Sequence, residues 1–377
     1  GSPGASLAEY TYLGLGQVVV QDLPQPDVKL DYFGGTSGAY AGFDRFGRVI
    51  DQRWYSYGMT QDVDRIKYGH DRASNRIWRE NLVSKSLFTP IYQDEFYTYD
   101  ALHRLKSFDR GQINGTYTGI TGTAAKEEDW TLDPLGNWSS FVQKTSGTTD
   151  LSQSRSVNQA NEITDISETT GSSWITPAYD RSGNMTTLPD SGNPTMSLTA
   201  TYDAWNRLVS IADSSSTLAT YAYDGLHRRI HATSSSVTRH FYHTTSWQTI
   251  EERLGTSSLT DRQYVWGPLY IDHLLCRDRD TSSTPDGTLD ERLYSLQDAN
   301  WNVTSIVDSS GTVQERIGYA PYGHIQFLDA SFSVRANSSF DIRTTYTGRE
   351  WLPEIGLYYF RNRWYHAGLG GFTSNDP

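Results

Sequence analysis

The sequence predicts an all-β protein whose tandem β-hairpins form a continuous, right-twisted antiparallel sheet, arranged as a spiral shell, a small barrel or an open stack. Composition supports this, because aromatic residues make up 13% of the chain, with 25 Tyr and 11 Trp, and 32 Gly and 13 Pro supply many turns. Aromatic and β-branched residues suit the half-buried face of a sheet. A short motif containing an aromatic residue and Asp also recurs along the chain. Long helices are not expected, although Leu352 to Ile355 could form a short turn.

The recurring motif reads aromatic residue, Asp, two variable residues, Gly, Asn or His, then Arg or Asn, and an apolar residue. The clearest copy runs from Tyr99 to Leu105, and a degenerate copy lies near residues 158–163. Spacings of roughly 20–50 residues indicate stacked supersecondary units. The repeat aspartates are Asp44, Asp71, Asp100, Asp133, Asp180, Asp203 and Asp224.

The residue types of one unit are those of a hairpin. The Asp carboxylate can accept hydrogen bonds from backbone N–H groups two residues on, which closes a turn. Gly, Asn or His tolerates the left-handed backbone that such a turn requires. The Arg that follows can lay its stem over neighbouring rings as the next strand begins. One hairpin cannot bury its own apolar face, so we expect the units to stack, and we interpret the aspartates as turn formers instead of catalytic acids.

Further motifs near the C-terminus lie at 294–308, 319–323, 346–350 and 356–365. Together with the repeats, they resemble the YD-repeat family of Rhs proteins, the cocoon-forming subunits of insecticidal toxin complexes and the teneurin shell. The segment from Gly356 is similar to the signature that closes the conserved core of such proteins. The matching signature residues are Gly356, Leu357, Tyr358, Tyr359, Arg361, Arg363, Tyr365 and Phe372.

The resemblance implies a structural scaffold that encloses or displays a C-terminal cargo segment of a larger secreted or surface protein, without catalysis in this fragment. In toxin-carrying relatives, aspartates near this end serve an aspartyl self-cleavage. Here His366 and Ala367 replace an expected Asp-Pro pair, Gly371 replaces an Arg, and only Asp376 matches a cleavage aspartate. We therefore expect self-cleavage only in a longer chain, with Asp376 as the candidate catalytic residue.

Charge and composition narrow the partners further. The formal net charge is -12, and no basic cluster is present, which argues against nucleic-acid binding. No segment is long and apolar enough for a membrane span, and no cofactor motif is found. The acidic loop at 278–291 and the pair His240 and His243 have side chains that metals bind, but a solvated loop and ordinary strand histidines are the better interpretation, so we predict no metal. The single cysteine, Cys276, is interpreted as a buried small apolar residue.

The expected organisation is one continuous structural domain with four regions. Residues 1–40 hold edge strands, with a cloning remnant or an internal cut at 1–6, and 41–232 form the repeat array. Residues 233–323 are strands with the acidic loop, and 324–377 hold the C-terminal signature. We expect the chain to be an excerpt of a longer extracellular or cell-surface polypeptide.

Two other functions stay open. Tyr and Trp rings on a sheet face could bind glycans in a surface or adhesion module, because such rings stack on sugars. Alternatively, the chain could be the autoproteolytic processing unit of a polymorphic toxin. The expected partners are its own C-terminal cargo or neighbouring parts of the parent polypeptide, and glycans if the chain is a glycan-binding module. Other copies of the chain could form an oligomer or filament with it through exposed sheet edges.

Overall fold

The structure is a computed structural model that describes residues 6–14, 16–34, 40–282 and 285–376. These residues form 31 β-strands, one four-residue helix, α1 (Leu82–Lys85), and one 3-10 turn, η1 (Tyr346–Gly348). Within every sheet the strand order follows the chain order, and neighbouring strands are antiparallel. The predicted all-β class and hairpin order are confirmed.

The first sheet has twelve strands. They are β1 (Glu9–Leu13), β2 (Gln17–Leu23), β3 (Val28–Asp31), β4 (Asp51–Ser56), β5 (Gln61–His70), β6 (Arg76–Asn81), β7 (Asp94–Tyr99), β8 (Leu105–Gly111), β9 (Lys126–Leu132), β10 (Trp138–Thr145), β11 (Thr148–Val157) and β12 (Ile163–Thr170).

The second sheet has fifteen strands and the third has four. The second comprises β13 (Ala178–Tyr179), β14 (Met185–Pro189), β15 (Ser197–Tyr202), β16 (Leu208–Ala212), β17 (Thr217–Tyr223), β18 (Arg229–Ser234), β19 (Val237–His243), β20 (Thr249–Leu254), β21 (Thr260–Trp266), β22 (Leu274–Arg279), β23 (Glu291–Gln297), β24 (Val303–Asp308), β25 (Val313–Tyr319), β26 (Ile325–Leu328) and β27 (Val334–Arg335). The third comprises β28 (Glu350–Leu352), β29 (Leu357–Phe360), β30 (Arg363–His366) and β31 (Gly371–Phe372).

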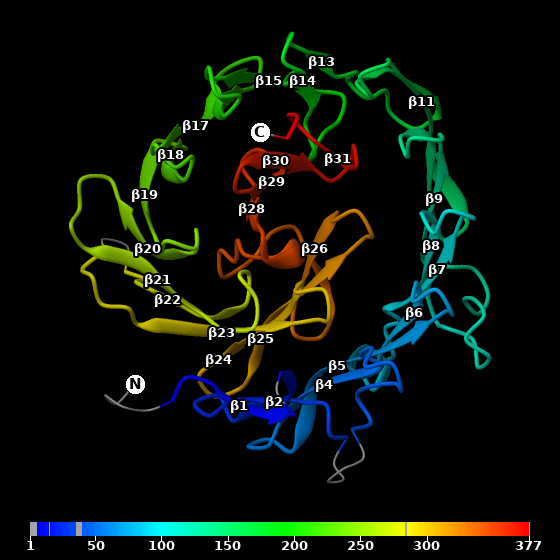
Figure 1. Cartoon of the computed structure of the whole chain (residues 1–377), viewed down its shortest axis with the longest axis vertical. Helices are drawn as coiled ribbons and strands as arrows, with labels where there is room; N and C mark the ends of the chain where they lie inside the picture. Colours follow the sequence, from blue (N-terminus) through cyan, green and yellow to red (C-terminus); the bar gives the residue numbers. More distant parts are fainter. Residues whose placement is uncertain (1–5, 15, 35–39, 283–284, 377) are drawn as a thin grey trace.

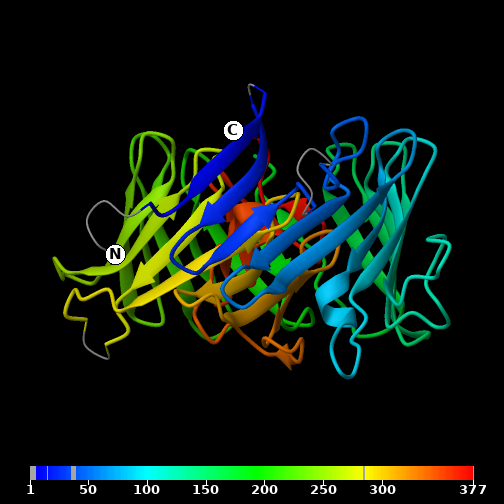
Figure 2. The ribbon, with the colours of Figure 1, turned by 90° about the horizontal axis from the view of Figure 1, so that it is seen from below.

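The strands wind into a spiral shell. Figure 1 shows β1 to β21 curving around the molecule as a wall, after which the chain turns inward and ends with β28 to β31 near the centre. From the side, the strands run obliquely between two rims of turns (Figure 2). Because successive strands are antiparallel, every second connection lies on the same rim.

The wall is doubled where the spiral overlaps itself. Leu23, Val28 and Trp54 of the first strands pack in one buried cluster with Cys276 and Tyr294 of β22 and β23. Polar contacts cross the same seam, since Trp54 Nε1 donates to the Gln297 carbonyl at 3.0 Å. The overlap therefore forms a two-layer core between segments more than 200 residues apart in sequence.

A second core joins the wall to the inner strands. Leu188, Leu208 and Ile211 of the wall are almost fully buried and pack in one cluster with Leu357 and Trp364 of the inner sheet. The sequence predicts that a hairpin needs neighbours to bury its apolar face. In this part of the wall the chain's own C-terminal strands cover that face.

The strand pairing is interrupted twice, between β12 and β13 and between β27 and β28. Neither break is visible in the repeat pattern. The expected turn after β28 is present, with the Ile355 and Gly356 amides donating to the Leu352 carbonyl. In the described part of the chain, neither short helix has the length and apolar character needed to cross a membrane.

Candidate functional site: the stitched rim and the enclosed C-terminal strands

Each repeat aspartate closes its turn through both carboxylate oxygens. In the clearest copy, Asp100 Oδ1 accepts hydrogen bonds from the Leu102 and Arg104 amides, each at 2.9 Å. Oδ2 accepts from Arg104 Nε at 2.7 Å, and His103 between them takes a positive φ of 62°. Hydrogen bonds from the backbone and side chain of Arg104 hold the pKa of Asp100 below its ordinary value.

The same arrangement recurs along the chain. In every copy Oδ1 accepts from the amides two and four residues on, and the side chain four residues on, Arg or Asn, reaches Oδ2. The aspartates placed in this way are Asp44, Asp71, Asp133, Asp180, Asp203 and Asp224. They lie apart in successive turns of one rim, so the structure does not bring them together as a catalytic group.

The same geometry appears where the motif is degenerate. Asn158 Oδ1 accepts from the Ala160 and Glu162 amides at 2.8 and 3.1 Å, which is the turn at the degenerate copy. Thr244 Oγ1 takes the same place in a turn that the sequence reasoning missed, where Trp247 has a φ of 69°. The turn has Thr in place of the repeat Asp and Trp in place of Gly, Asn or His, so its sequence does not match the motif.

The repeat arginines also link each turn to the next one along the rim. Arg104 Nη1 donates to the Asp133 carbonyl at 2.7 Å, and Arg207 Nη1 donates to the Asp224 carbonyl at 3.2 Å. Arg48 joins the Asp71 carbonyl in the same way at 3.0 Å. The sequence predicts that these side chains lie over rings, which Arg207 does over Tyr223, but no motif predicts the link between turns.

Two of the repeat tyrosines link their hairpin to the preceding one, whereas the Tyr202 hydroxyl donates to the Thr373 carbonyl of the C-terminal segment. Tyr223 Oη donates to the Leu208 carbonyl at 2.7 Å, and Tyr99 Oη donates to the Arg76 carbonyl at 2.8 Å. In both cases the acceptor lies five residues after the aspartate of the previous unit. In these two copies the Asp closes its own turn and the Tyr contacts the unit before it.

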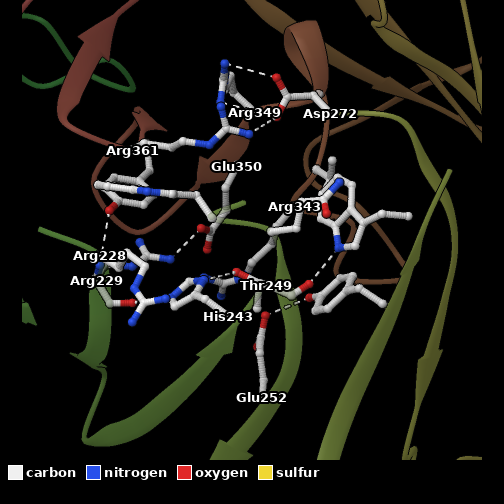
Figure 3. A pocket seen from close by; sticks show the side chains of 17 residues that line it. Arg228, Arg229, His243, Thr249, Glu252, Asp272, Arg343, Arg349, Glu350 and Arg361 are labelled. Atoms are coloured by element: carbon white, nitrogen blue, oxygen red, sulfur yellow. Dashed lines mark hydrogen bonds and ion pairs between the residues drawn. The ribbon is translucent and has the colours of Figure 1, made fainter. Parts of the chain in front are cut away.

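The inner strands meet the wall through a group of charged side chains, which Figure 3 shows from close by. Arg229 of β18 is buried and pairs with Glu350 of β28, and its guanidinium lies 4.3 Å from the ring centres of both Phe241 and Tyr359. His243 Nε2 lies 2.8 Å from the Arg229 carbonyl. The stacked, ion-paired guanidinium holds β28 and β29 against the wall.

Two further ion pairs, both made by Asp272, lie on the other side of this charged group. Buried Asp272 pairs with Arg349 at 3.0 Å and with Arg361, a signature residue, at 2.5 Å. Burial raises the pKa of the Asp272 carboxyl, while Arg349 and Arg361 oppose that rise. The cavity among these groups measures about 70 Å³, room for a few water molecules and too small for a substrate. We interpret these ion pairs of Arg229 and Asp272 with the inner strands as a latch that holds the inner sheet against the wall.

A larger cavity of about 760 Å³ lies between the wall and the inner strands. Trp130, Trp138 and Tyr322 form one aromatic cluster on its lining, with Trp130 and Trp138 ring centres 5.8 Å apart. Trp130 is buried, and its Nε1 has no hydrogen-bond partner within the described residues. The volume is that of an ordinary ligand site.

The remaining signature residues pack the inner sheet. Tyr358 is fully buried and donates to the Gly323 carbonyl at 2.7 Å, and Tyr365 donates to the Tyr322 carbonyl at 3.0 Å. Leu357 lies in the core with the wall, and Gly356 has a φ of 65° that completes the turn after β28. These residues act in packing within the described structure.

The candidate cleavage aspartate lies at the surface. Asp376 pairs with Arg363 at 2.8 Å, and its side chain is 80% exposed. Arg363 in turn lies 3.7 Å from the ring centre of Phe372. Among the described residues no carboxylate is bonded to Asp376, whereas aspartyl chemistry needs two that share a proton.

His366, which replaces the family's Asp, has become a buried structural residue. Its Nε2 lies 2.9 Å from the Pro189 carbonyl, and its Nδ1 accepts from the Leu369 amide at 3.1 Å. Burial lowers the pKa of His366 to about 4. Ser191 Oγ is 3.3 Å from Nε2 but donates to the Gly356 carbonyl at 2.6 Å, so the two do not form a nucleophile and base.

The other sequence candidates are held by local contacts. In the acidic loop, Asp280 Oδ2 accepts from the Asp286 and Gly287 amides at 2.7 and 2.8 Å. His240 lies against His231, while His243 faces Arg229. Within the described ranges no three His, Cys, Asp or Glu side chains gather as metal ligands.

The fold and its turns, which the repeat arginines link along one rim, define a class of protein, the YD-repeat β-shell. The family model described as RHS Repeat matches residues 202–236, which span β16 to β18 and the turns at Asp203 and Asp224. This match and the shared fold support the predicted resemblance to the Rhs family of YD-repeat proteins.

Curated relatives are much longer than this chain. The tRNA3(Ser)-specific nuclease WapA of Bacillus spizizenii is 29% identical over 256 residues, which are 66% of this chain and 10% of that protein. The tRNA nuclease WapA of Bacillus subtilis strain 168 is 28% identical over 257 residues, with the same coverage. The chain thus spans about a tenth of the relatives it matches, and their nuclease names describe the whole proteins.

Solved structures share the fold. The TcdB2-TccC3-Cdc42 crystal structure superposes with a TM-score of 0.72 and 19% identity over 100% of this chain and 18% of that chain. A Photorhabdus luminescens Tc holotoxin pore with mutated TccC3 gives a TM-score of 0.70 and 17% identity over 98% of this chain and 18% of that chain.

Proposed function

We propose that this chain is a structural shell segment of a larger extracellular or cell-surface polypeptide, with no turnover of its own. It holds the C-terminal strands inside its curve and displays a C-terminal cargo segment at its rim. The observation that carries this proposal is the placement of β28 to β31. They lie inside the wall, buried against it and latched by Arg229 and Glu350, while Asp376 is 80% exposed.

A reporter peptide with one specific protease site, appended after residue 377, tests the display step. We expect rapid cleavage in the intact chain with no change in its melting temperature, because Asp376, the last described residue, is exposed. A reporter that resists cleavage until the shell unfolds would overturn display. Robust turnover in a hydrolysis screen over polysaccharide and peptide libraries would overturn the absence of catalysis.

Glycan recognition is the second candidate, and one observation favours a particular place for it. The large cavity carries aromatic rings and the unpartnered Nε1 of Trp130, which could stack on a sugar and donate to it. Glycan-array binding that is lost in Trp130→Phe, with the melting temperature retained, would support this site. A clean negative array would remove it.

Self-cleavage is the third candidate, for a longer parent chain. Mass spectrometry of that chain with and without Asp376→Asn decides it, since an identical cleavage pattern excludes Asp376. Assembly through sheet edges stays a proposal that an oligomer mass would test. The division into regions at 1–40, 41–232, 233–323 and 324–377 likewise remains our proposal.

A further inference from the structure

The rim that carries the repeat aspartates also carries a row of exposed apolar side chains. We call this the YD rim and define it by the turns at 44–48, 71–75, 100–104, 133–137, 158–162, 180–184, 203–207, 224–228 and 244–248. The residue two positions after the anchor stands at the tip of each turn. Five of these tips are large and apolar: Phe46 is 67% exposed, Leu102 66%, Leu135 76%, Trp205 63% and Leu226 63%.

The turn geometry explains why these tips face solvent. At each tip the backbone amide donates to the anchoring carboxylate, as Leu102 does to Asp100 and Leu226 does to Asp224. The amide is thus fixed towards the sheet, and the side chain is left beyond the end of the strands. None of the five belongs to a core cluster, so packing does not account for their apolar character.

The tips are fixed points on a curved line. Within each sheet, neighbouring turns of this rim are two strand spacings apart, which is about 10 Å. Arg104 and Arg207 tie successive turns together, so the tips are held in place relative to one another. Figure 1 shows the wall curving around the molecule, and such a curved rim can meet a plane at several points at once.

Charge on the rim is locally balanced although the chain carries a formal net charge of -12. In the turns at Asp100, Asp203 and Asp224 the carboxylate is paired with the Arg four residues on. Arg45 and Arg72 add cations next to their own tips. The rim is therefore a nearly neutral edge with apolar points on an acidic molecule.

These features distinguish between two kinds of partner. A protein interface has a contiguous, close-packed centre, whereas neighbouring tips of this rim are about 10 Å apart, and the turns at 71–75, 158–162 and 180–184 between them have only Ala or Ser at the tip. A lipid surface deforms around each tip separately, and Trp, Phe and Leu are the side chains that enter the interface of a bilayer. We propose that the YD rim binds the surface of a zwitterionic lipid bilayer by inserting these tips.

This inference is independent of the proposed function, but it bears on the place where the chain's last described residues lie. Ser374 and Asn375 share a small hollow with Trp205 and Arg207, and Asn375 Nδ2 donates to the Ser182 carbonyl of the same rim. The C-terminal end and the lipid-facing tips are therefore on one side of the shell.

Co-sedimentation with phosphatidylcholine vesicles tests the proposal. We expect the chain to bind, and the triple variant Leu102→Asn, Leu135→Asn and Leu226→Asn to bind at least about tenfold more weakly, because it removes three of the five apolar tips. Asn is suited to turn positions, so this variant should keep its melting temperature. Addition of phosphatidylserine should weaken binding at low salt, because the protein is acidic.

The opposite rim provides a matched control. Met59, Phe88 and Met196 are 37%, 106% and 46% exposed and lie in the other set of connections. Their triple Asn variant should bind vesicles as the parent chain does. Equal losses of vesicle binding in both variants would overturn the proposal, and so would the absence of vesicle binding by the parent chain. If the parent chain binds no vesicles and only the YD-rim variant changes its oligomer mass, the rim contacts other copies of the chain instead of lipid.

Discussion

The anchoring side chain of a YD turn needs one well-placed oxygen more than it needs a charge. Oδ1 of Asp203 accepts from the Trp205 and Arg207 amides at 2.9 and 3.0 Å, and Asn158 does the same work with an amide oxygen. The Arg–Asp ion pair is an addition at the surface of the turn, where ion pairs contribute little.

Asp203→Ala should therefore destabilise the chain by about 1–2 kcal/mol, as the loss of a helix-capping side chain does. Asp203→Asn keeps the acceptor oxygen and should lose less than half as much. Urea unfolding of both variants measures the difference. Equal losses in Ala and Asn would mean that the charge matters most, against this account.

The repeat tyrosine makes a separate contribution. Tyr223→Phe removes the hydrogen bond to the Leu208 carbonyl, which lies at 2.7 Å, and leaves that carbonyl without this donor. We expect a loss of about 0.5–1.5 kcal/mol. Tyr242→Phe, at an exposed position of β19, provides the control and should have no measurable effect. Urea unfolding again provides the comparison.

The buried histidine makes stability depend on pH. The pKa of His366 is about 4 in the folded chain and about 6.5 when unfolded, so between these values the unfolded state binds more protons. Stability must then fall as pH falls from 6.5 to 4, by about 3 kcal/mol at most. Protonation would place an N–H at Nδ1 against the Leu369 amide, close to the charges of Arg155 and Asp190.

His366→Gln should reduce the drop in melting temperature between pH 7 and pH 4.5, because it removes the buried imidazole that takes up a proton on unfolding. An unaltered drop in His366→Gln would show that other buried groups, such as His273, control the response.

At the scale of elements, the sequence determines what is local and leaves open what is remote. The hairpins, the turn aspartates and the left-handed positions follow from chemistry within about five residues, so the motif predicted them. The link from Arg104 to the Asp133 carbonyl and the pairing of Arg229 with Glu350 join residues whose neighbourhood depends on strand register and on the path of the spiral. No spacing in the sequence encodes either contact.

The latch between wall and inner sheet gives a prediction at this scale. Glu350→Gln leaves the buried Arg229 charge without its partner and should cost about 2–4 kcal/mol. The double variant Arg229→Met and Glu350→Gln removes the charge as well and should be more stable than Glu350→Gln alone, although it loses the stacking on Phe241 and Tyr359. Urea unfolding of the parent, both single variants and the double variant measures the coupling. A double variant less stable than either single one would contradict the latch.

At the scale of the whole molecule, the spiral is held shut where its first strands cover β22 to β24. Leu23, Val28 and Leu30 lie on one side of this seam, and Cys276 and Leu296 lie on the other. The overlap converts an open row of hairpins into a closed body, because each layer covers the apolar face of the other. The repeat motif alone does not predict it, since the same hairpins could extend as an open sheet.

The single cysteine reports on this closure. Cys276 is fully buried in the seam, and burial raises the pKa of its thiol to about 12, so a maleimide reagent should meet neither an accessible sulfur nor a thiolate at neutral pH. Labelling in the native chain should therefore require the two layers to separate, and its rate should follow the stability of the seam. Trp54→Ala removes a side chain that packs in the seam and donates to the Gln297 carbonyl, so it should accelerate labelling by tenfold or more, because a Trp to Ala change in a core costs about 3–5 kcal/mol. Leu102→Asn on the rim should leave the rate unchanged. Labelling of the parent chain as fast as that of the urea-unfolded chain would show that the layers are apart in solution, and the closed spiral would then be wrong.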